Sequence, residues 1–198
     1  MIPMKEIIYV TGNKDKFQDG ERILKNYGYQ CVQEKLNFQE LQEIDGEIIA
    51  KHKAKQAYEQ FKQPLFINDT VWMIPALNNF PGAFMKYTND AFAPEDWLRL
   101  MHGIGDRRAI LREFVVYKDE NYQKVFYRDV VGEFLNESSG INGESSDKVI
   151  SLSGDNVSIA KSRDTGGSLT SSARSKTSYD LLGEWLQTTE SSATRNLA

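Results

Sequence analysis

Cysteine and histidine are scarce in this chain. Its 198 residues include one cysteine, Cys31, and two histidines. A single cysteine excludes an internal disulfide framework and any metal site built from several cysteines. Two histidines leave little room for a histidine-based metal cage or a catalytic triad. We therefore expect a protein of a reducing compartment, and hence a cytoplasmic one.

Long apolar runs and an excess of charge of one sign are also missing. No apolar run approaches the roughly 20 residues that cross a bilayer, so we expect no membrane partner. The 24 basic and 28 acidic residues are mixed along the chain and give a net charge of −4. Nucleic-acid binding needs a concentrated basic face, and we do not expect it here. A few lysines could still form a local pocket for a small polyanion.

What the sequence does contain is an alternation of strand-like and helical segments. Short β-branched runs predict buried strands, and apolar residues at helical spacing predict amphipathic helices. This alternation favours an α/β fold in which some strands pair in parallel. Over the first third of the chain the predicted strands are residues 7–10, 29–36 and 64–67, and the predicted helices are residues 14–26 and 46–61.

The rest of the chain is less regular. The patterns predict a short helix from Pro94, a hairpin of strands 109–117 and 125–134, and a last helix over 176–187. Between the hairpin and that helix the chain is rich in serine and glycine, and only 149–152 looks strand-like. We expect one domain over residues 1–188 and a disordered polar tail over 189–198.

Two polar clusters near the N-terminus could bind an anion or a metal. Residues 11–16 turn from a strand into a helix, where a glycine, free backbone N–H groups and lysines suit a phosphate. They do not form a Walker loop. Residues 41–47 carry acidic groups that could hold Mg²⁺, with Lys53 further along the helix. Taken alone, an ordinary turn and a solvated acidic loop explain these segments better.

Two further clusters follow. Asn68-Asp69-Thr70 is predicted to end a buried strand, where a carboxylate could bind metal or accept a proton from an attacking water. Residues 172–176 offer a hydroxyl and a guanidinium at a helix start, although a serine cap with surface cations is the simpler interpretation. Asp164-Thr165-Gly166 matches the aspartic-protease triplet, but nothing supplies the second such aspartate.

Together and in this order, the clusters resemble the inosine triphosphate pyrophosphatase family, which hydrolyses noncanonical purine nucleoside triphosphates to monophosphate and pyrophosphate. The resemblance runs from about residue 5 to 186 and is strongest over 7–87. The matching motifs are Thr11-Gly12-Asn13 with Lys16, Leu41-Gln42-Glu43-Ile44-Asp45-Gly46, Lys53, Asn68-Asp69-Thr70-Val71 and Pro81-Gly82-Ala83-Phe84. The family's Ser-His-Arg motif becomes Ser172-Ala173-Arg174.

The resemblance implies a role for each matching residue. It implies that Asn13, Lys16 and Lys53 grip the triphosphate, with Thr11 and Gly12 beside them. It implies that Glu43 and Asp69 hold Mg²⁺, that Asp69 also orients or deprotonates the attacking water, and that Glu40 is the alternative metal ligand. It assigns Asp147, Ser172 and Arg174 to substrate binding. It further implies an elongated mixed sheet in two lobes with a nucleotide cleft between them, and a homodimer.

The departures from the family pattern concern mainly the base. Asn68 stands where the family has an acid, and Val71 where it has a glycine. The segment that stacks an aromatic ring on the purine is similar in position to residues 143–148, which keep Asp147 but contain no ring. Loss of such a ring removes about 1–3 kcal/mol of base binding at nucleic-acid sites.

Two hypotheses follow from this pattern. The first is a Mg²⁺-dependent nucleoside triphosphate pyrophosphatase with altered base specificity. The second is a weakened or inactive relative that uses the same residues as a nucleotide-binding or protein-interaction module.

Overall fold

The computed structural model describes residues 4–39, 41–152, 156–166 and 176–195, with the backbone alone over 190–195. Residues 1–69, 113–128 and 175–198 form one compact unit, unit 1, and residues 70–112 and 129–174 form another, unit 2. None of the helices in the described ranges is both long and apolar enough to span a membrane.

The strands form one mixed sheet with the order β2-β1-β3-β5-β6-β7, and β4 pairs with β3. β1 pairs in parallel with β2 and β3, whereas β3–β4 and β6–β7 are antiparallel. The predicted α/β fold with a mixed sheet flanked by helices is therefore confirmed. The strands are β1 Lys5–Val10, β2 Tyr29–Glu34, β3 Leu65–Met73, β4 Pro81–Gly82, β5 Arg108–Lys118, β6 Gln123–Phe134 and β7 Ile150–Ser151.

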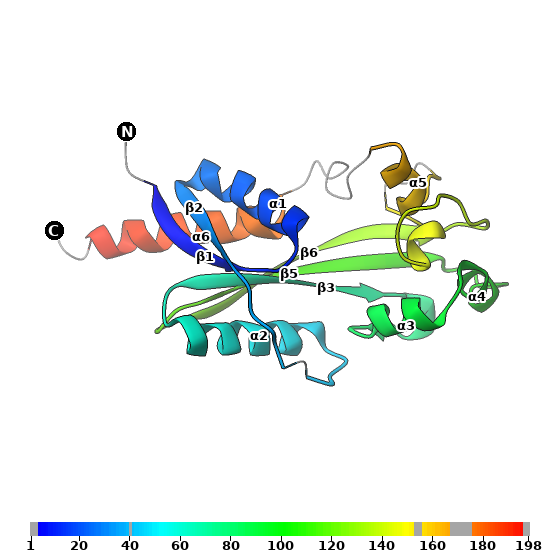
Figure 1. The fold of residues 1–198 in the computed structure, drawn as a ribbon, viewed down its shortest axis with the longest axis horizontal. Coiled ribbons are helices and arrows are strands. Elements are labelled where there is room, and N and C mark those ends of the chain that lie inside the picture. The colour runs from blue at the N-terminus through cyan, green and yellow to red at the C-terminus, as the bar shows by residue number, and fades with distance from the viewer. Residues whose placement is uncertain (1–3, 40, 153–155, 167–175, 196–198) are drawn as a thin grey trace. The chain divides into compact units, whose positions relative to one another are not determined.

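Unit 1 holds three helices: α1 Lys14–Leu24, α2 Gly46–Phe61 and α6 Ser178–Arg195. α1 and α6 lie side by side over one face of the strands, and α2 lies on the other face of β3 (Figure 1). Asn13 and Asp45 start α1 and α2 because their side chains accept backbone N–H groups of the first turns. α2 has the predicted bounds. α6 was predicted to end at 187, but it continues through most of the segment predicted as a disordered tail.

The core of unit 1 fills the space between the sheet and the pair α1 and α6. Tyr9 stacks on Phe66 with ring centroids 4.2 Å apart, and its hydroxyl hydrogen-bonds Tyr179 at 2.8 Å. Gly20 allows this close approach, because a Cβ at that position would lie 2.8 Å from the Tyr9 ring. The buried members of this core are Ile7, Tyr9, Ile23, Leu24, Tyr29, Cys31, Phe66, Val115, Tyr117, Phe126, Tyr179, Leu182 and Leu186.

Unit 2 has its own apolar core around the fully buried Trp97, which packs near Phe92 and Phe134. α4 begins at Pro94 as predicted. The spacing rules did not predict α3 or α5, which have only seven and six residues and too few turns to show a periodic stripe. The short helices of unit 2 are α3 Met85–Ala91, α4 Pro94–Leu100 and α5 Ile159–Asp164.

One strand boundary differs from the prediction in a way that matters for the site. The apolar run 64–67 was predicted to end at Asn68, but β3 continues to Met73 and Asp69 is the fifth of its nine residues. The apolar run predicted only the part of β3 that pairs with β1, where Leu65 lies opposite Ile8 and Ile67 lies opposite Val10. β3 continues because Trp72 and Met73 pair with β4. Asp69 still lies two residues beyond the last pair with β1.

Candidate functional site

The turn from β1 into α1 is open to a ligand at its glycine. Thr11 is buried, and its hydroxyl accepts the N–H of Asn13 at 3.1 Å. Asn13 in turn accepts the backbone N–H of Lys16 at 3.0 Å, so its carbonyl oxygen is used as a helix cap. A Cβ at Gly12 would meet no atom within 4 Å. The space beside Gly12 is therefore free, as backbone that contacts a phosphate requires.

Lys16 extends from the first turn of α1 among other charged groups of unit 1. Burial lowers the pKa of its ammonium group below the ordinary value, and the neighbouring Lys53 acts in the same direction. The carboxylates of Asp69 and Glu113 oppose that decrease. Lys53, Asp69 and Glu113 thus all act on the charge of Lys16, and we call these four residues the Lys16 group.

Lys53 and Asp69 form the best-defined contact of this group. The Lys53 Nζ lies 2.9 Å from the Asp69 Oδ2 and donates a hydrogen bond to it. The exposed fractions of the two side chains are 17% and 21%, so water screens the pair only in part. Lys53 lies in the second turn of α2 and Asp69 in β3, and the contact joins the two elements at the sheet end where β1 stops.

Glu113, a member of this group, is paired with Arg128, and the sequence patterns predicted neither residue. They face each other across the β5–β6 hairpin, with the Arg128 Nε 3.4 Å from the Glu113 Oε2. Glu113 also accepts a hydrogen bond from the Ser178 hydroxyl at the start of α6. A signal was available: both residues fall in register with the inward-facing Val115 and Phe126, where a strand normally carries an apolar side chain.

Glu43 is engaged in its own loop. Its Oε1 accepts the backbone N–H groups of Ile44 at 2.7 Å and Asp45 at 3.3 Å, which shapes the turn before α2. Glu40, the alternative metal ligand, lies outside the described residues, as do Ser172 and Arg174. Among the described residues, no three or more His, Cys, Asp or Glu side chains come together as a metal-binding group.

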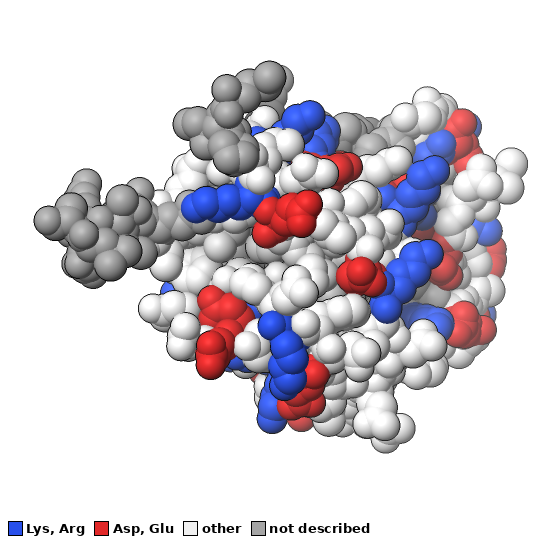
Figure 2. Space-filling view, turned by 60° about the vertical axis from the view of Figure 1, so that its left-hand side comes forward, with Lys and Arg blue, Asp and Glu red and all other residues white. Residues whose placement is uncertain are grey.

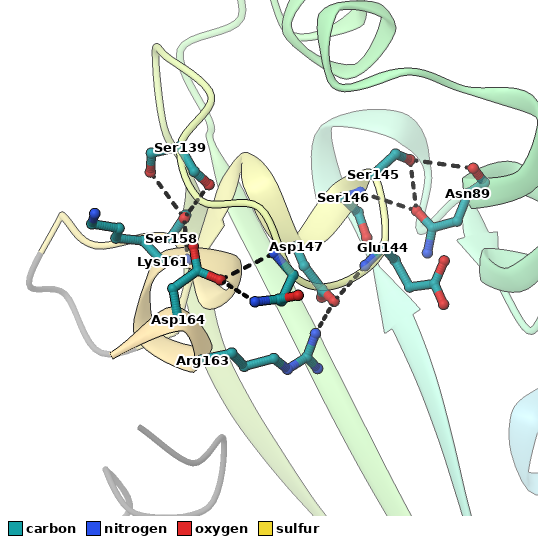
Figure 3. Close-up of polar contacts among 11 residues, drawn as sticks. Asn89, Ser139, Glu144, Ser145, Ser146, Asp147, Ser158, Lys161, Arg163 and Asp164 are labelled. Carbon is teal, nitrogen blue, oxygen red and sulfur yellow. Dashed lines mark hydrogen bonds and ion pairs between the residues drawn. The ribbon is translucent and has the colours of Figure 1, made fainter. Parts of the chain in front are cut away.

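In unit 2, Asp147 lies in the segment that resembles the family's base-stacking loop, and its charge is already balanced. The side chain is buried, with 6% of the residue exposed. One carboxylate oxygen accepts the backbone N–H of Glu144 at 2.9 Å and is also paired with Arg163, as Figure 3 shows. A Cβ at Gly143 would lie 2.7 Å from that oxygen, so the tight loop depends on glycine there.

The same loop is tied to α3 and α4 through its two serines. The Asn89 Oδ1 accepts both the Ser145 hydroxyl at 3.0 Å and the Ser146 backbone N–H at 3.1 Å (Figure 3). The Ser145 hydroxyl also accepts the indole N–H of the buried Trp97. Where the family stacks a ring, this chain thus has a loop closed by polar contacts within unit 2.

Asp164, the aspartate of the protease-like triplet, has a structural role in the same region. It accepts the backbone N–H groups of Ile141 at 2.8 Å and Asn142 at 3.1 Å. These two hydrogen bonds lower the pKa of its carboxyl group. Asp164 therefore holds the 141–142 turn against α5.

The visible surface agrees with the mixed charge of the sequence. On the face that Figure 2 shows, basic and acidic side chains of the described residues alternate in small groups rather than forming a continuous basic band. Nothing on this face provides the concentrated positive surface that nucleic-acid binding needs.

An α/β fold in which lysines and carboxylates lie where parallel strands end, beside a helix start, is an arrangement that can bind phosphate. The sequence narrows this class. The model of the Ham1 family matches residues 7–178, so the chain belongs to the Ham1 family. The predicted membership of the inosine triphosphate pyrophosphatase family is thereby confirmed.

Individual relatives support this family assignment. The chain is 33% identical to the dITP/XTP pyrophosphatase of Methanosarcina mazei over 152 aligned residues. The alignment covers 76% of this chain and 83% of that protein. It is 28% identical over 141 residues to the inosine triphosphate pyrophosphatase of Candida glabrata, covering 68% of this chain and 73% of that one. The Staphylococcus aureus Ham1 structure superposes with a TM-score of 0.72 at 21% identity, covering 92% and 98% of the two chains, and supports the fold.

Proposed function

We propose that this protein is a nucleoside triphosphate pyrophosphatase. In the reaction, a water oxygen attacks the α-phosphorus, the bond from that phosphorus to the α–β bridging oxygen breaks, and nucleoside monophosphate and pyrophosphate are released. The names of the similar proteins support this reaction, since they are dITP/XTP pyrophosphatases. The observation that carries the proposal for this chain is the group of Lys16, Lys53 and Asp69 at the carboxyl end of β1.

In this proposal the two lysines neutralise the triphosphate. Phosphoryl transfer needs positioning and charge neutralisation far more than covalent help from the protein. A lysine whose ammonium group is partly desolvated gains more from an anion than a lysine in water does, because the local dielectric is lower. Lys16 satisfies this condition, and Lys53 would exchange part of its contact with Asp69 for phosphate oxygens. Thr11, Gly12 and Asn13 would contribute backbone groups at the helix start.

Asp69 would act on the water and on a divalent ion. Mg²⁺ is held by one or two carboxylates together with substrate phosphates and water. The carboxylate of Asp69 is the kind of oxygen ligand that such an ion takes. Asp69 would then be a ligand, with Glu43 as the predicted second one, and the ion would neutralise charge on the phosphates. Asp69 would also orient or deprotonate the attacking water.

Base selectivity would differ from that of family members that stack a ring on the purine. The closed polar loop over residues 143–148 supports this part of the proposal, because Asp147 is paired with Arg163 and no aromatic ring is present. We further propose a homodimer, on family resemblance alone, and a cytoplasmic location. The latter agrees with the single free and buried thiol of Cys31, whose pKa burial raises to about 12.

The decisive experiment is incubation of the purified protein with Mg²⁺ and a panel of dITP, XTP, ITP, ATP and GTP. Pyrophosphate and orthophosphate are measured separately, and Asp69→Asn serves as the blank. We expect pyrophosphate from at least one purine triphosphate and no orthophosphate. If none of the panel yields pyrophosphate while a nucleotide still raises the melting temperature, the alternative of an inactive nucleotide-binding module replaces this proposal.

A further inference from the structure

Buried polar atoms without hydrogen-bond partners occur on two strands of unit 1, β3 and β6. Among the described residues, four buried side-chain atoms lack such a partner: Oδ1 and Nδ2 of Asn68, and Nε and Nη1 of Arg128. The Arg128 Nε is within ion-pair distance of Glu113 but is not aligned for a hydrogen bond. Leaving a buried polar group unpaired destabilises the folded protein, and a charged group does so more than a neutral one. Such atoms therefore point to a binding partner.

Strand geometry puts both side chains on the same face of the sheet. Phe66 belongs to the core beneath α1 and α6, and Asn68 follows it by two residues on β3. Arg128 likewise follows the core residue Phe126 by two positions on β6. Because strand side chains alternate between faces, Asn68 and Arg128 extend the apolar α1–α6 face with polar groups.

The contacts of β5 show at which end of the strands Arg128 lies. Tyr117 lines a pocket together with Lys5 and Ile7, at the start of β1. Glu113, four residues earlier on β5, lies at the other end and acts on the charge of Lys16. Arg128 contacts Glu113 and is therefore at the end of the sheet where Lys16, Lys53 and Asp69 lie.

The Arg128 side chain is 11% exposed and that of Glu113 is 12% exposed. A buried ion pair with imperfect geometry recovers only part of the cost of desolvating its two charges. A guanidinium group also has five N–H donors in a fixed fork, which suits a phosphate better than a single misaligned carboxylate oxygen. The pair is thus poorly satisfied as a purely structural contact.

We infer that Asn68 and Arg128 form a further anion subsite beside Lys16, in which the guanidinium and the amide N–H groups donate to phosphate oxygens. Glu113 holds Arg128 in place in the free protein and competes with the phosphate for it. The inference deepens the proposed function, and it names residues that bind the polyphosphate rather than take part in bond breaking.

Inorganic pyrophosphate is the probe, titrated calorimetrically in EDTA and again with Mg²⁺, so that no turnover is needed. We expect Arg128→Gln to weaken pyrophosphate binding about tenfold, as loss of a charge-assisted contact does. Arg128→Lys keeps the charge but loses the fork, and we expect a loss of about threefold. Glu113→Gln removes the competitor and should strengthen binding about threefold.

The matched control is Arg112→Gln. Arg112 precedes Glu113 on β5 and forms an ion pair with Asp129, with the Arg112 Nε 2.7 Å from the Asp129 Oδ1. The two side chains are 30% and 32% exposed. We expect unchanged pyrophosphate binding for this variant. The opposite signs expected for Glu113→Gln and Arg128→Gln separate competition for a ligand from a loss of structure, which would weaken binding in both.

Folded Arg128 variants that bind pyrophosphate as tightly as the wild type would overturn the inference. If neither Arg128 variant folds, Glu113→Gln decides: stronger binding supports the subsite, and unchanged or weaker binding refutes it. A protein that hydrolyses no nucleotide but binds pyrophosphate in an Arg128-dependent way would refute the proposed function and leave the subsite standing. The reverse result would refute the subsite alone.

Discussion

The end of the sheet around Lys16 and the loop over residues 143–148 both contain buried charge, but they use it differently. Around Lys16, two lysines share neighbouring carboxylates, the lysine is desolvated, and Asn68 and Arg128 keep buried atoms without hydrogen bonds. In the loop, Asp147 receives an N–H group and a guanidinium, and both serines are bonded to Asn89. Incomplete satisfaction indicates a site that awaits a ligand, whereas complete satisfaction indicates structure.

The largest effect should come from Asp69. We expect Asp69→Asn to lower kcat for pyrophosphate release about 100- to 1,000-fold, because the carboxylate that would polarise the water and hold the divalent ion is lost. Steady-state kinetics with the best purine triphosphate measure this. Asp129→Asn, in an exposed ion pair, should change kcat less than about threefold. An Asp69→Asn enzyme with about half of the wild-type kcat would show that the charged group is not catalytic.

The loop should respond in stability rather than in phosphate binding. Arg163→Met leaves the buried Asp147 carboxylate with one partner fewer, and we expect the free energy of unfolding to fall by about 2 kcal/mol. Pyrophosphate affinity should stay the same. Urea unfolding measures the change in stability, and calorimetric titration measures the affinity for pyrophosphate. Arg108→Met, which breaks an exposed pair with Asp106 in the same unit, should leave the free energy of unfolding nearly unchanged.

Lys16 should show the reverse pattern. Replacing it with methionine removes a cation, so pyrophosphate binding should weaken about tenfold. The same change removes a desolvated charge, and we expect the free energy of unfolding at neutral pH to rise by about 1 kcal/mol. A Lys16→Met variant that is less stable than the wild type would mean that the lysine holds the fold together rather than the ligand.

The pH dependence sharpens this test. Burial lowers the folded-state pKa of Lys16 below 10.5, its ordinary value. Between these two values the unfolded chain binds more protons than the folded chain, so the contribution of Lys16 to stability rises with pH over that interval. Pyrophosphate affinity should fall over the same interval, because the charge that binds the anion is lost. Both trends should be absent in Lys16→Met.

The smallest expected effect concerns the base. Glu144 is exposed and stands in the segment where the family has an aromatic ring. We expect Glu144→Phe to lower KM for XTP about fivefold, at the lower end of stacking energies, and to leave pyrophosphate binding unchanged. Glu120→Phe, an exposed change in the β5–β6 turn, is the control. An equal gain for pyrophosphate would show that the ring does not act on the base.

Much of the architecture could be predicted because it depends on local pattern. The stripe over residues 46–61 predicted α2 with its observed bounds, and the alternating apolar residues predicted the β5–β6 hairpin. Lys53 and Asp69 could be selected together because both match motifs of the family that the sequence resembles, and the structure brings them to 2.9 Å. The end of β3 was wrong because pairing with β4 extends the strand beyond its apolar run.

The sequence by itself determined the α/β alternation and the family, because both depend on short patterns that can be recognised along the chain. Only the tertiary structure decided that Glu113 meets Arg128, and that Asp147 is neutralised by a guanidinium sixteen residues away. Strand register and burial bring such partners together. Burial also decides which charges are satisfied by the protein and which are left for a ligand.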